Sequence, residues 1–190
     1  QGIIPDITDP IPNEELRIIL RNEMNTDFLL ENLNERPLTV TTIRKDEFES
    51  YFETELLFKD EYIGTFKAIF LYPKTQEKFP VIIASHGHGD NGYKYRDLYF
   101  GTEYVQRGYG ILIPFKRAMC GHADYEGRVS EIALLNGIPF MGIRNYELML
   151  TKKWLSSLEE VDSENIGGIG HSGGSADCNL SIRLEDVFKA

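Results

Sequence analysis

Three short apolar runs separated by helical segments constrain the fold of this chain more than any other feature. Residues 81–84 (Val-Ile-Ile-Ala) and 110–114 (Gly-Ile-Leu-Ile-Pro) are continuously apolar, and residues 165–170 form a third, glycine-rich run. Runs of this kind are typical of strands that are covered on both faces. Helices are predicted between them, at residues 95–107 and over a long amphipathic stretch at 143–161. Strands that alternate with helices predict parallel βαβ units with right-handed crossovers.

The first half of the chain has a different pattern. Residues 51–72 contain two segments rich in aromatic and β-forming side chains around a polar turn, which predicts an antiparallel hairpin. The hairpin supplies two strands, so residues 81–84 are expected to form the third strand of the sheet. Residues 13–34 suit a helix or a helix pair, and residues 115–137 are expected to be irregular. We therefore predict an α/β fold with a mostly parallel, doubly wound sheet entered through an N-terminal antiparallel hairpin.

Composition and charge limit the class of protein and its partners. The chain has 190 residues, 42% hydrophobic and 26% charged, which suits one globular domain. We divide it into an N-terminal arm and helical segment (1–45) and the sheet-forming part (46–190). The formal net charge of −10 argues against nucleic acid as a partner, because like charges repel the phosphate backbone. No apolar run is long enough to predict a membrane span.

The first residue and the cysteines leave the compartment open. The chain starts with Gln1 rather than Met, so it is either a processed end left by signal-peptide removal or a boundary inside a longer chain. The first alternative implies a secreted or periplasmic protein, and the second a cytoplasmic one. Two cysteines, Cys120 and Cys178, show no disulfide framework and are expected to be separate free thiols.

The sequence Gly170-His171-Ser172-Gly173-Gly174 fits the pattern G-x-S-x-G. This pattern suits a serine on a sharp turn from a strand into a helix, with its hydroxyl above the sheet and flanking glycines that let strand and helix approach. The start of the helix also favours developing negative charge. Because a strand and a helix are predicted on either side, we expect Ser172 to be a nucleophile and Gly170 and Gly174 to be the glycines that the turn requires.

A second glycine-rich segment follows the first apolar run, at Ser85-His86-Gly87-His88-Gly89. Acyl transfer needs two backbone N–H groups that point at the oxyanion, one from the residue after the nucleophile and one from a loop at the end of a neighbouring strand. We therefore expect the N–H groups of Gly173 and His88 to form an oxyanion hole. For His86, a buried side chain that braces the loop is the favoured interpretation.

These segments, together with others, resemble the α/β-hydrolase superfamily, in particular its branch of acetyl xylan esterases and dienelactone hydrolase-like proteins. The resemblance covers residues 79–190 and depends on the matching segments 86–89, 107–110, 142–144, 160–167 and 170–174. It implies a serine esterase-type hydrolase that cleaves a small-molecule or carbohydrate carboxylic ester, with an acetylated carbohydrate as one candidate, and uses no metal or organic cofactor. Where the family has Asp-x-Arg-Gly, this chain has Phe115-Lys116-Arg117-Ala118, a departure that concerns the substrate pocket.

The order of triad residues in this fold is serine, then Asp or Glu, then His. All four histidines (His86, His88, His122 and His171) lie at or before the predicted turn, and the later acids Asp177, Glu185 and Asp186 lie on or just beyond the helix that follows it. We therefore expect the triad acid and histidine to be absent, the fold to be truncated at its C-terminal side, and turnover to be weak or absent. An open sheet edge at that side would favour self-association.

Two other functions stay open from the sequence. His86-Gly87-His88-Gly89-Asp90 also resembles the H-x-H-x-D-H motif of metal-dependent hydrolases, although Asn91 replaces the last histidine. Alternatively, the protein is a non-catalytic scaffold that retains the serine turn. The group formed by Cys120, His122 and Asp124 is interpreted as a polar loop rather than a metal site.

Overall fold

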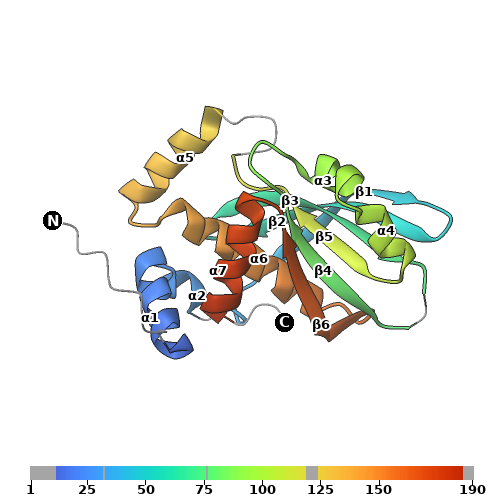
Figure 1. Ribbon diagram of the computed structural model, residues 1–190, viewed down its shortest axis with the longest axis horizontal. Helices are drawn as coiled ribbons and strands as arrows, with labels where there is room; N and C mark the ends of the chain where they lie inside the picture. The colour runs from blue at the N-terminus through green and yellow to red at the C-terminus, as the bar shows by residue number, and fades with distance from the viewer. Residues whose placement is uncertain (1–11, 32, 76, 119–123, 186–190) are drawn as a thin grey trace.

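A six-stranded sheet with helices on both faces forms the body of the protein (Figure 1). The computed structural model describes residues 12–31, 33–75, 77–118 and 124–185. The strands are β1 (Thr39–Glu47), β2 (Tyr51–Asp60), β3 (Gly64–Pro73), β4 (Phe79–Ser85), β5 (Gly110–Pro114) and β6 (Val161–Gly170). They lie in the order β1-β2-β3-β5-β4-β6. The pairings β1–β2, β2–β3 and β3–β5 are antiparallel, whereas β4 is parallel to both β5 and β6. Consequently β2, β4, β5 and β6 point the same way.

Seven helices connect or flank these strands in the described residues. They are α1 (Asn13–Met24), α2 (Asp27–Leu30), α3 (Gly92–Leu98), α4 (Gly101–Gln106), α5 (Asp124–Leu135), α6 (Phe140–Ser156) and α7 (Gly173–Glu185). One buried cluster joins α6 and α7 to one face of the sheet, and a second joins α3 and α4 to the other face. The prediction of a doubly wound α/β sheet is therefore confirmed.

The antiparallel hairpin predicted at residues 51–72 is formed by β2 and β3. Asp60 closes its turn: one carboxylate oxygen accepts the backbone N–H groups of Tyr62 (2.9 Å) and Ile63 (3.1 Å), and Gly64 follows with φ +75°. Tyr146 of α6 donates its hydroxyl to the other oxygen of Asp60, at 3.1 Å. The same buried carboxylate therefore both makes the turn and attaches it to the long helix.

Strand β1 was not predicted, and it changes the strand count. It pairs with β2 along most of its length, so residues 81–84 lie in the fourth strand and the prediction that they form the third was wrong. Residues 39–47 are mostly polar and exposed, so this edge strand has no apolar run by which the sequence could reveal it. β1 also crosses the boundary expected between residues 45 and 46.

The helices differ from the expectations in three places. The segment 95–107 contains two helices, α3 and α4, because Phe100 between them adopts a left-handed conformation with φ +64°. The stretch 115–137, expected to be irregular, contains α5. The long helix ends at Ser156, so Leu158 lies beyond it and Val161 begins β6 instead of extending the helix. The helix predicted after Ser172 is confirmed as α7.

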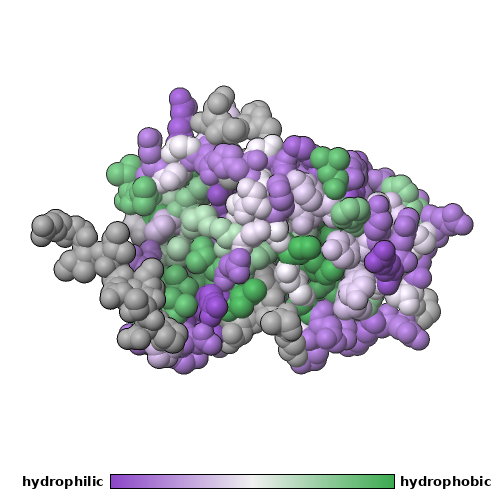
Figure 2. All heavy atoms as spheres, in the orientation of Figure 1, coloured by the Kyte–Doolittle hydropathy of each residue, from purple (hydrophilic) through white to green (hydrophobic). Residues whose placement is uncertain are grey.

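The surface seen in Figure 2 carries both polar and apolar side chains. Apolar side chains gather at the C-terminal end of α5, where Ile132, Leu134 and Leu135 are exposed (Figure 2). None of the helices in the described ranges is both long and apolar enough to span a bilayer.

Candidate active site

Ser172 lies on a sharp turn between β6 and α7, as expected. Its φ is +53°, a left-handed conformation that is unusual for a residue with a side chain, and the residue is exposed. The backbone N–H of Ser175 donates to the Ser172 carbonyl at 2.9 Å, and that of Gly174 donates to the His171 carbonyl at 2.8 Å. These bonds make α7 begin directly after the serine.

Gly170 and Gly174 are the positions at which the turn leaves no room for a side chain. A Cβ atom on Gly170 would lie 2.3 Å from the carbonyl oxygen of Gly174, and a Cβ atom on Gly174 would lie 1.9 Å from the carbonyl oxygen of Ser85. In both cases the obstacle is backbone that cannot move independently. The two glycines therefore let α7 pack directly against the ends of β6 and β4.

Gly173 and His88, the residues expected to supply the oxyanion hole, lie next to each other. The position that a Cβ atom would occupy on Gly173 is 3.9 Å from the backbone nitrogen of His88. The backbone N–H of His171 donates to the Ser85 carbonyl at 3.1 Å, which fixes the serine turn against the end of β4. The loop after β4 and the residue after Ser172 therefore lie side by side.

His86 is completely buried and joins two loops. One ring nitrogen (Nδ1) lies 2.9 Å from the carbonyl oxygen of Gly87, and the other (Nε2) accepts the backbone N–H of Lys116 at 3.1 Å. These partners require a neutral ring with its proton on Nδ1. Burial lowers the pKa of His86 to about 4, mainly because the charged ring would lose its solvation. His86 therefore braces the loop after β4 against the residues that follow β5.

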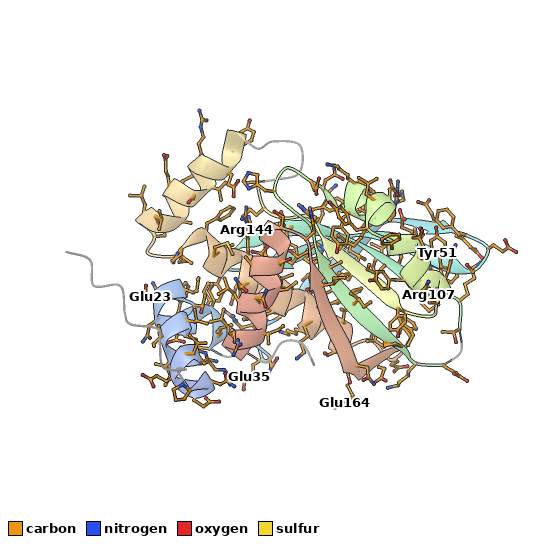
Figure 3. The ribbon with its side chains drawn as sticks, in the orientation of Figure 1. Glu23, Glu35, Tyr51, Arg107, Arg144 and Glu164 are labelled. Carbon is orange, nitrogen blue, oxygen red and sulfur yellow. The ribbon has the colours of Figure 1, made fainter. Side chains whose placement is uncertain are left out.

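The His88 side chain points away from this space and meets α5. It is 63% exposed, and its Nε2 lies 3.2 Å from a carboxylate oxygen of Glu126. Arg144 of α6, labelled in Figure 3, donates to the other oxygen of Glu126 at 2.8 Å. Glu126 thus connects α5 both to the loop that carries His88 and to the long helix.

The His171 ring faces α3 and the loop after β4. It lies against the Tyr99 ring, with centroids 4.6 Å apart, and its Nδ1 is 3.8 Å from a carboxylate oxygen of Asp90. Asp90 also pairs with Lys94, which lowers the pKa of Asp90. His171 is therefore engaged on the side of the turn that faces α3.

Asp177 is on α7, where the sequence analysis placed it, and it is buried in an ion pair. Its Oδ2 lies 2.5 Å from the Nζ of Lys116 and accepts the hydroxyl of Ser85 at 3.2 Å. Sequence reasoning missed Lys116 as a site residue, although it noted the segment 115–118 as a departure from the family pattern. No local pattern could identify Lys116, because its partner Asp177 lies 61 positions further along the chain.

A second ion pair, between a partly exposed arginine and a buried glutamate, lies beside the first. Glu147 of α6 is buried, and its Oε1 accepts the Nε–H of Arg117 at 2.9 Å and lies 2.8 Å from Nη2 of the same guanidinium. Burial raises the pKa of Glu147 to about 7, with Arg117 opposing that shift. A cavity of about 410 Å³ lies next to these residues, between the start of β3, residues 115–118 and α5.

The residues of the alternative metal motif do not converge. His86 uses both ring nitrogens within the loops, the His88 side chain meets Glu126, and Asp90 pairs with Lys94. Within the ranges that the structure describes, no three His, Cys, Asp or Glu residues form a group that could hold a metal ion. Cys120 and His122 lie outside those ranges, and only the backbone of Asp124 is described.

The neutral state of His86 predicts how stability depends on pH. Since the folded pKa is about 4 and the ordinary value is 6.5, the unfolded chain binds the proton more tightly. The contribution of His86 is therefore complete above pH 6.5 and decreases as the pH falls to 4, by about 3 kcal/mol in total. Urea denaturation at pH 7.5 and pH 4 should show that the His86→Gln variant loses less stability than the wild type.

A matched variant separates this effect from general acid sensitivity. His171→Gln changes an exposed histidine in the adjacent turn, and His86→Gln should lose less stability than this variant as well. Glu147 acts in the opposite direction, because its raised pKa lowers stability as the pH rises from 4.5 to 7, but it is present in all three proteins. Equal losses for the wild type and His86→Gln would contradict the assignment of a neutral His86.

Comparison with known proteins finds similarity to a bacterial protein and to several solved structures. No family model matches the chain. A Bacillus subtilis (strain 168) protein named "Putative hydrolase YtaP" is 28% identical over 172 residues, which make up 81% of this chain and 56% of that protein. The chain therefore spans little more than half the length of this relative.

Solved structures of acetyl xylan esterases are also similar. One described as a putative acetyl xylan esterase from Bacteroides fragilis NCTC 9343 has a TM-score of 0.73 at 18% identity, covering 95% of this chain and 54% of that one. Acetyl xylan esterase 1 from Thermoanaerobacterium sp. JW/SL YS485 has a TM-score of 0.70 at 18% identity, covering 94% and 61%. The chain therefore has the α/β-hydrolase fold of these esterases, which confirms at the level of the fold the resemblance seen in its sequence.

Proposed function

We propose that the protein is a serine esterase-type hydrolase with Ser172 as its nucleophile. The observation that carries the proposal is the turn itself: Ser172 is exposed at φ +53°, and the next residue lies beside the His88 backbone nitrogen. A strained, exposed serine between a strand and a helix suits nucleophilic attack, because its hydroxyl is held away from the backbone that surrounds it.

The N–H groups of His88 and Gly173 are proposed as the oxyanion hole. When the Ser172 oxygen adds to an ester carbonyl, a C–O bond forms and the carbonyl π electrons move to the carbonyl oxygen. Two backbone donors fixed beside that oxygen stabilise the charge without reorganising. The bond from His171 to Ser85 supports this role, because it holds the serine turn against the end of β4, and the buried His86 ring braces the loop that carries His88.

For the substrate class we propose a carboxylic ester on a carbohydrate, such as an acetylated sugar. Support comes from the similar structures, which are named acetyl xylan esterases. The chain spans little more than half the length of those proteins. The activity for which they are named therefore belongs to a longer chain than this one.

The attack also needs a base to accept the serine proton, and we propose that the described part of the chain supplies neither the triad histidine nor the acid. His86 has both ring nitrogens engaged, the His88 side chain pairs with Glu126, and His171 lies against Tyr99. Asp177 is held by Lys116 and Ser85. We accordingly infer weak or absent turnover for residues 1–190.

Self-association through the sheet edge is part of the same proposal. In the described part of the chain, β6 is the last strand of the sheet and pairs with β4 alone. Its other edge presents backbone groups to which a further strand could bind.

A fluorophosphonate probe tests the nucleophile. The probe forms a phosphorus–oxygen bond to the serine and releases fluoride, so mass spectrometry of peptides identifies the modified residue. We expect labelling at Ser172, none in the Ser172→Ala variant, and unchanged labelling in Ser163→Ala, which changes an exposed serine of β6. A folded wild-type protein that is not labelled at Ser172, either with or without added imidazole, would support the scaffold interpretation instead.

Imidazole in solution tests the missing base. If the chain lacks the histidine that accepts the proton, added imidazole should accelerate labelling of Ser172, by about tenfold or more at high concentration. Labelling rates at constant pH and ionic strength, with and without imidazole, measure this effect, and potassium chloride serves as the salt control. Fast labelling that imidazole does not change would mean that a base is already present within residues 1–190.

Two substitutions at position 88 test the oxyanion hole. His88→Pro removes the backbone N–H, and labelling should become slower by about 10²- to 10³-fold, the usual effect of losing one such donor. His88→Ala removes the contact with Glu126 but retains the N–H, so its labelling rate should stay close to the wild-type rate. Circular dichroism confirms that both variants fold. Equal rates for all three proteins would exclude the N–H of residue 88 from the site.

A further inference from the structure

A buried ion pair lies close to the serine turn and has no role in the mechanism proposed above. Lys116 follows β5 and Asp177 lies on α7, with 2.5 Å between Nζ and Oδ2. Their side chains are 5% and 1% exposed. Burying two charges costs several kcal/mol for each ion unless partners compensate, so a pair at this depth needs a physical explanation.

The ammonium group of Lys116 lies next to the proposed oxyanion hole. It is 3.9 Å from the position that a Cβ atom would occupy on Gly173, the same distance at which the His88 backbone nitrogen lies from that position. Asp177 is four residues beyond Gly173 on α7, so both lie on one face of the helix. The His88 backbone nitrogen and the Lys116 ammonium, which is held by an ion pair, therefore both lie close to Gly173.

The pair is anchored at each end to the segments that form the site. The backbone N–H of Lys116 donates to His86, whose other nitrogen contacts the carbonyl of Gly87 in the loop that carries His88. Asp177 accepts the hydroxyl of Ser85, the last residue of β4. A displacement of Lys116 would therefore disturb both the charge beside Gly173 and the loop that supplies the second donor.

Among the described cations, Lys116 lies nearest to the position of a Cβ atom on Gly173, and the two arginines in this region have partners of their own. Arg117 is bound by Glu147, and Arg144 is bound by Glu126. Burial lowers the pKa of Lys116, and the attraction of Asp177 opposes this shift. Asp177 thus holds the ammonium in place and favours its charged form.

We propose that Lys116 and Asp177 are positioning residues for the oxyanion site of Ser172, with Asp177 holding the Lys116 ammonium beside Gly173 so that its charge stabilises the adduct anion. This inference rests on the proposed function. In a low-dielectric site, a charge that is already fixed acts more strongly than one that must reorganise. The pair stabilises the anion through its field, whereas the two N–H groups bind it directly.

Phenylboronic acid measures this effect without turnover. The Ser172 oxygen donates an electron pair to the vacant boron orbital, a B–O bond forms, the hydroxyl proton passes to solvent, and boron becomes a tetrahedral anion. Boron-11 NMR distinguishes this adduct from the trigonal acid and yields its dissociation constant. The wild type should form the adduct, and Ser172→Ala should not.

The decisive variant is the double substitution Lys116→Met/Asp177→Asn. It removes both charges without leaving one unpaired, and the asparagine oxygen can still accept the Ser85 hydroxyl. We expect it to fold with a thermal midpoint near that of the wild type and to bind phenylboronate at least about tenfold more weakly. Lys116→Arg retains the cation and should stay within about threefold of the wild-type affinity. The matched control Lys74→Met/Glu47→Gln removes an ion pair on the protein surface and should change nothing.

Each other outcome identifies what has failed. Wild-type affinity in the folded double variant would show that the pair only stabilises the fold, and the inference would be overturned while Ser172 remained the nucleophile. A Lys116→Arg variant as weak as the double variant, or an equal loss in the surface control, would overturn it too. Absence of a tetrahedral adduct in the wild type, with no fluorophosphonate labelling, would remove the proposed function and this inference together.

Discussion

The arrangement of the candidate site depends on how closely α7 approaches the end of β4. The backbone of Gly174 lies so near the Ser85 carbonyl that no side chain fits between them. This contact holds the start of α7 over β4 as well as over β6, the strand that leads into the turn. Because β4 and β6 are parallel neighbours, their C-terminal ends lie at the same edge of the sheet. In α/β proteins the loops at this edge usually carry the functional residues.

Charge burial follows from the same contact. With α7 packed against β4 and α6 beside it, the side chains of Lys116, Asp177 and Glu147 are enclosed between helices and strand ends, whereas Arg117 is partly exposed. Such pairs seldom add stability relative to well-packed apolar residues, because desolvation offsets their attraction. Their geometric role is clearer: each joins a residue after β5 to a helix on one face of the sheet. The segment 115–118 is thereby fixed relative to the serine turn.

The sequence predicted the parts of this structure that depend on local patterns. Continuous apolar runs identified β4 and β5, and the glycine spacing around Ser172 identified the turn. Strand β1 escaped detection because its exposed, polar residues have no periodicity that distinguishes them from a loop. The break between α3 and α4 was missed because it depends on the conformation of Phe100, which no residue preference predicts. The Lys116–Asp177 pair could not be foreseen, since it joins positions that only the folded sheet brings together.

The left-handed backbone at Ser172 has a consequence for how such a chain can vary. A residue with a side chain at this φ costs about 1–2 kcal/mol relative to a relaxed backbone, and glycine would not incur that cost. Under the proposed function, the hydroxyl needed for attack and the most stable backbone conformation are therefore opposed at this single position. A lineage that no longer needed the reaction would gain stability by replacing this serine with glycine. Under the proposal that residue 172 is the nucleophile, the strain at this position is the energetic cost of a side-chain hydroxyl that glycine could not supply.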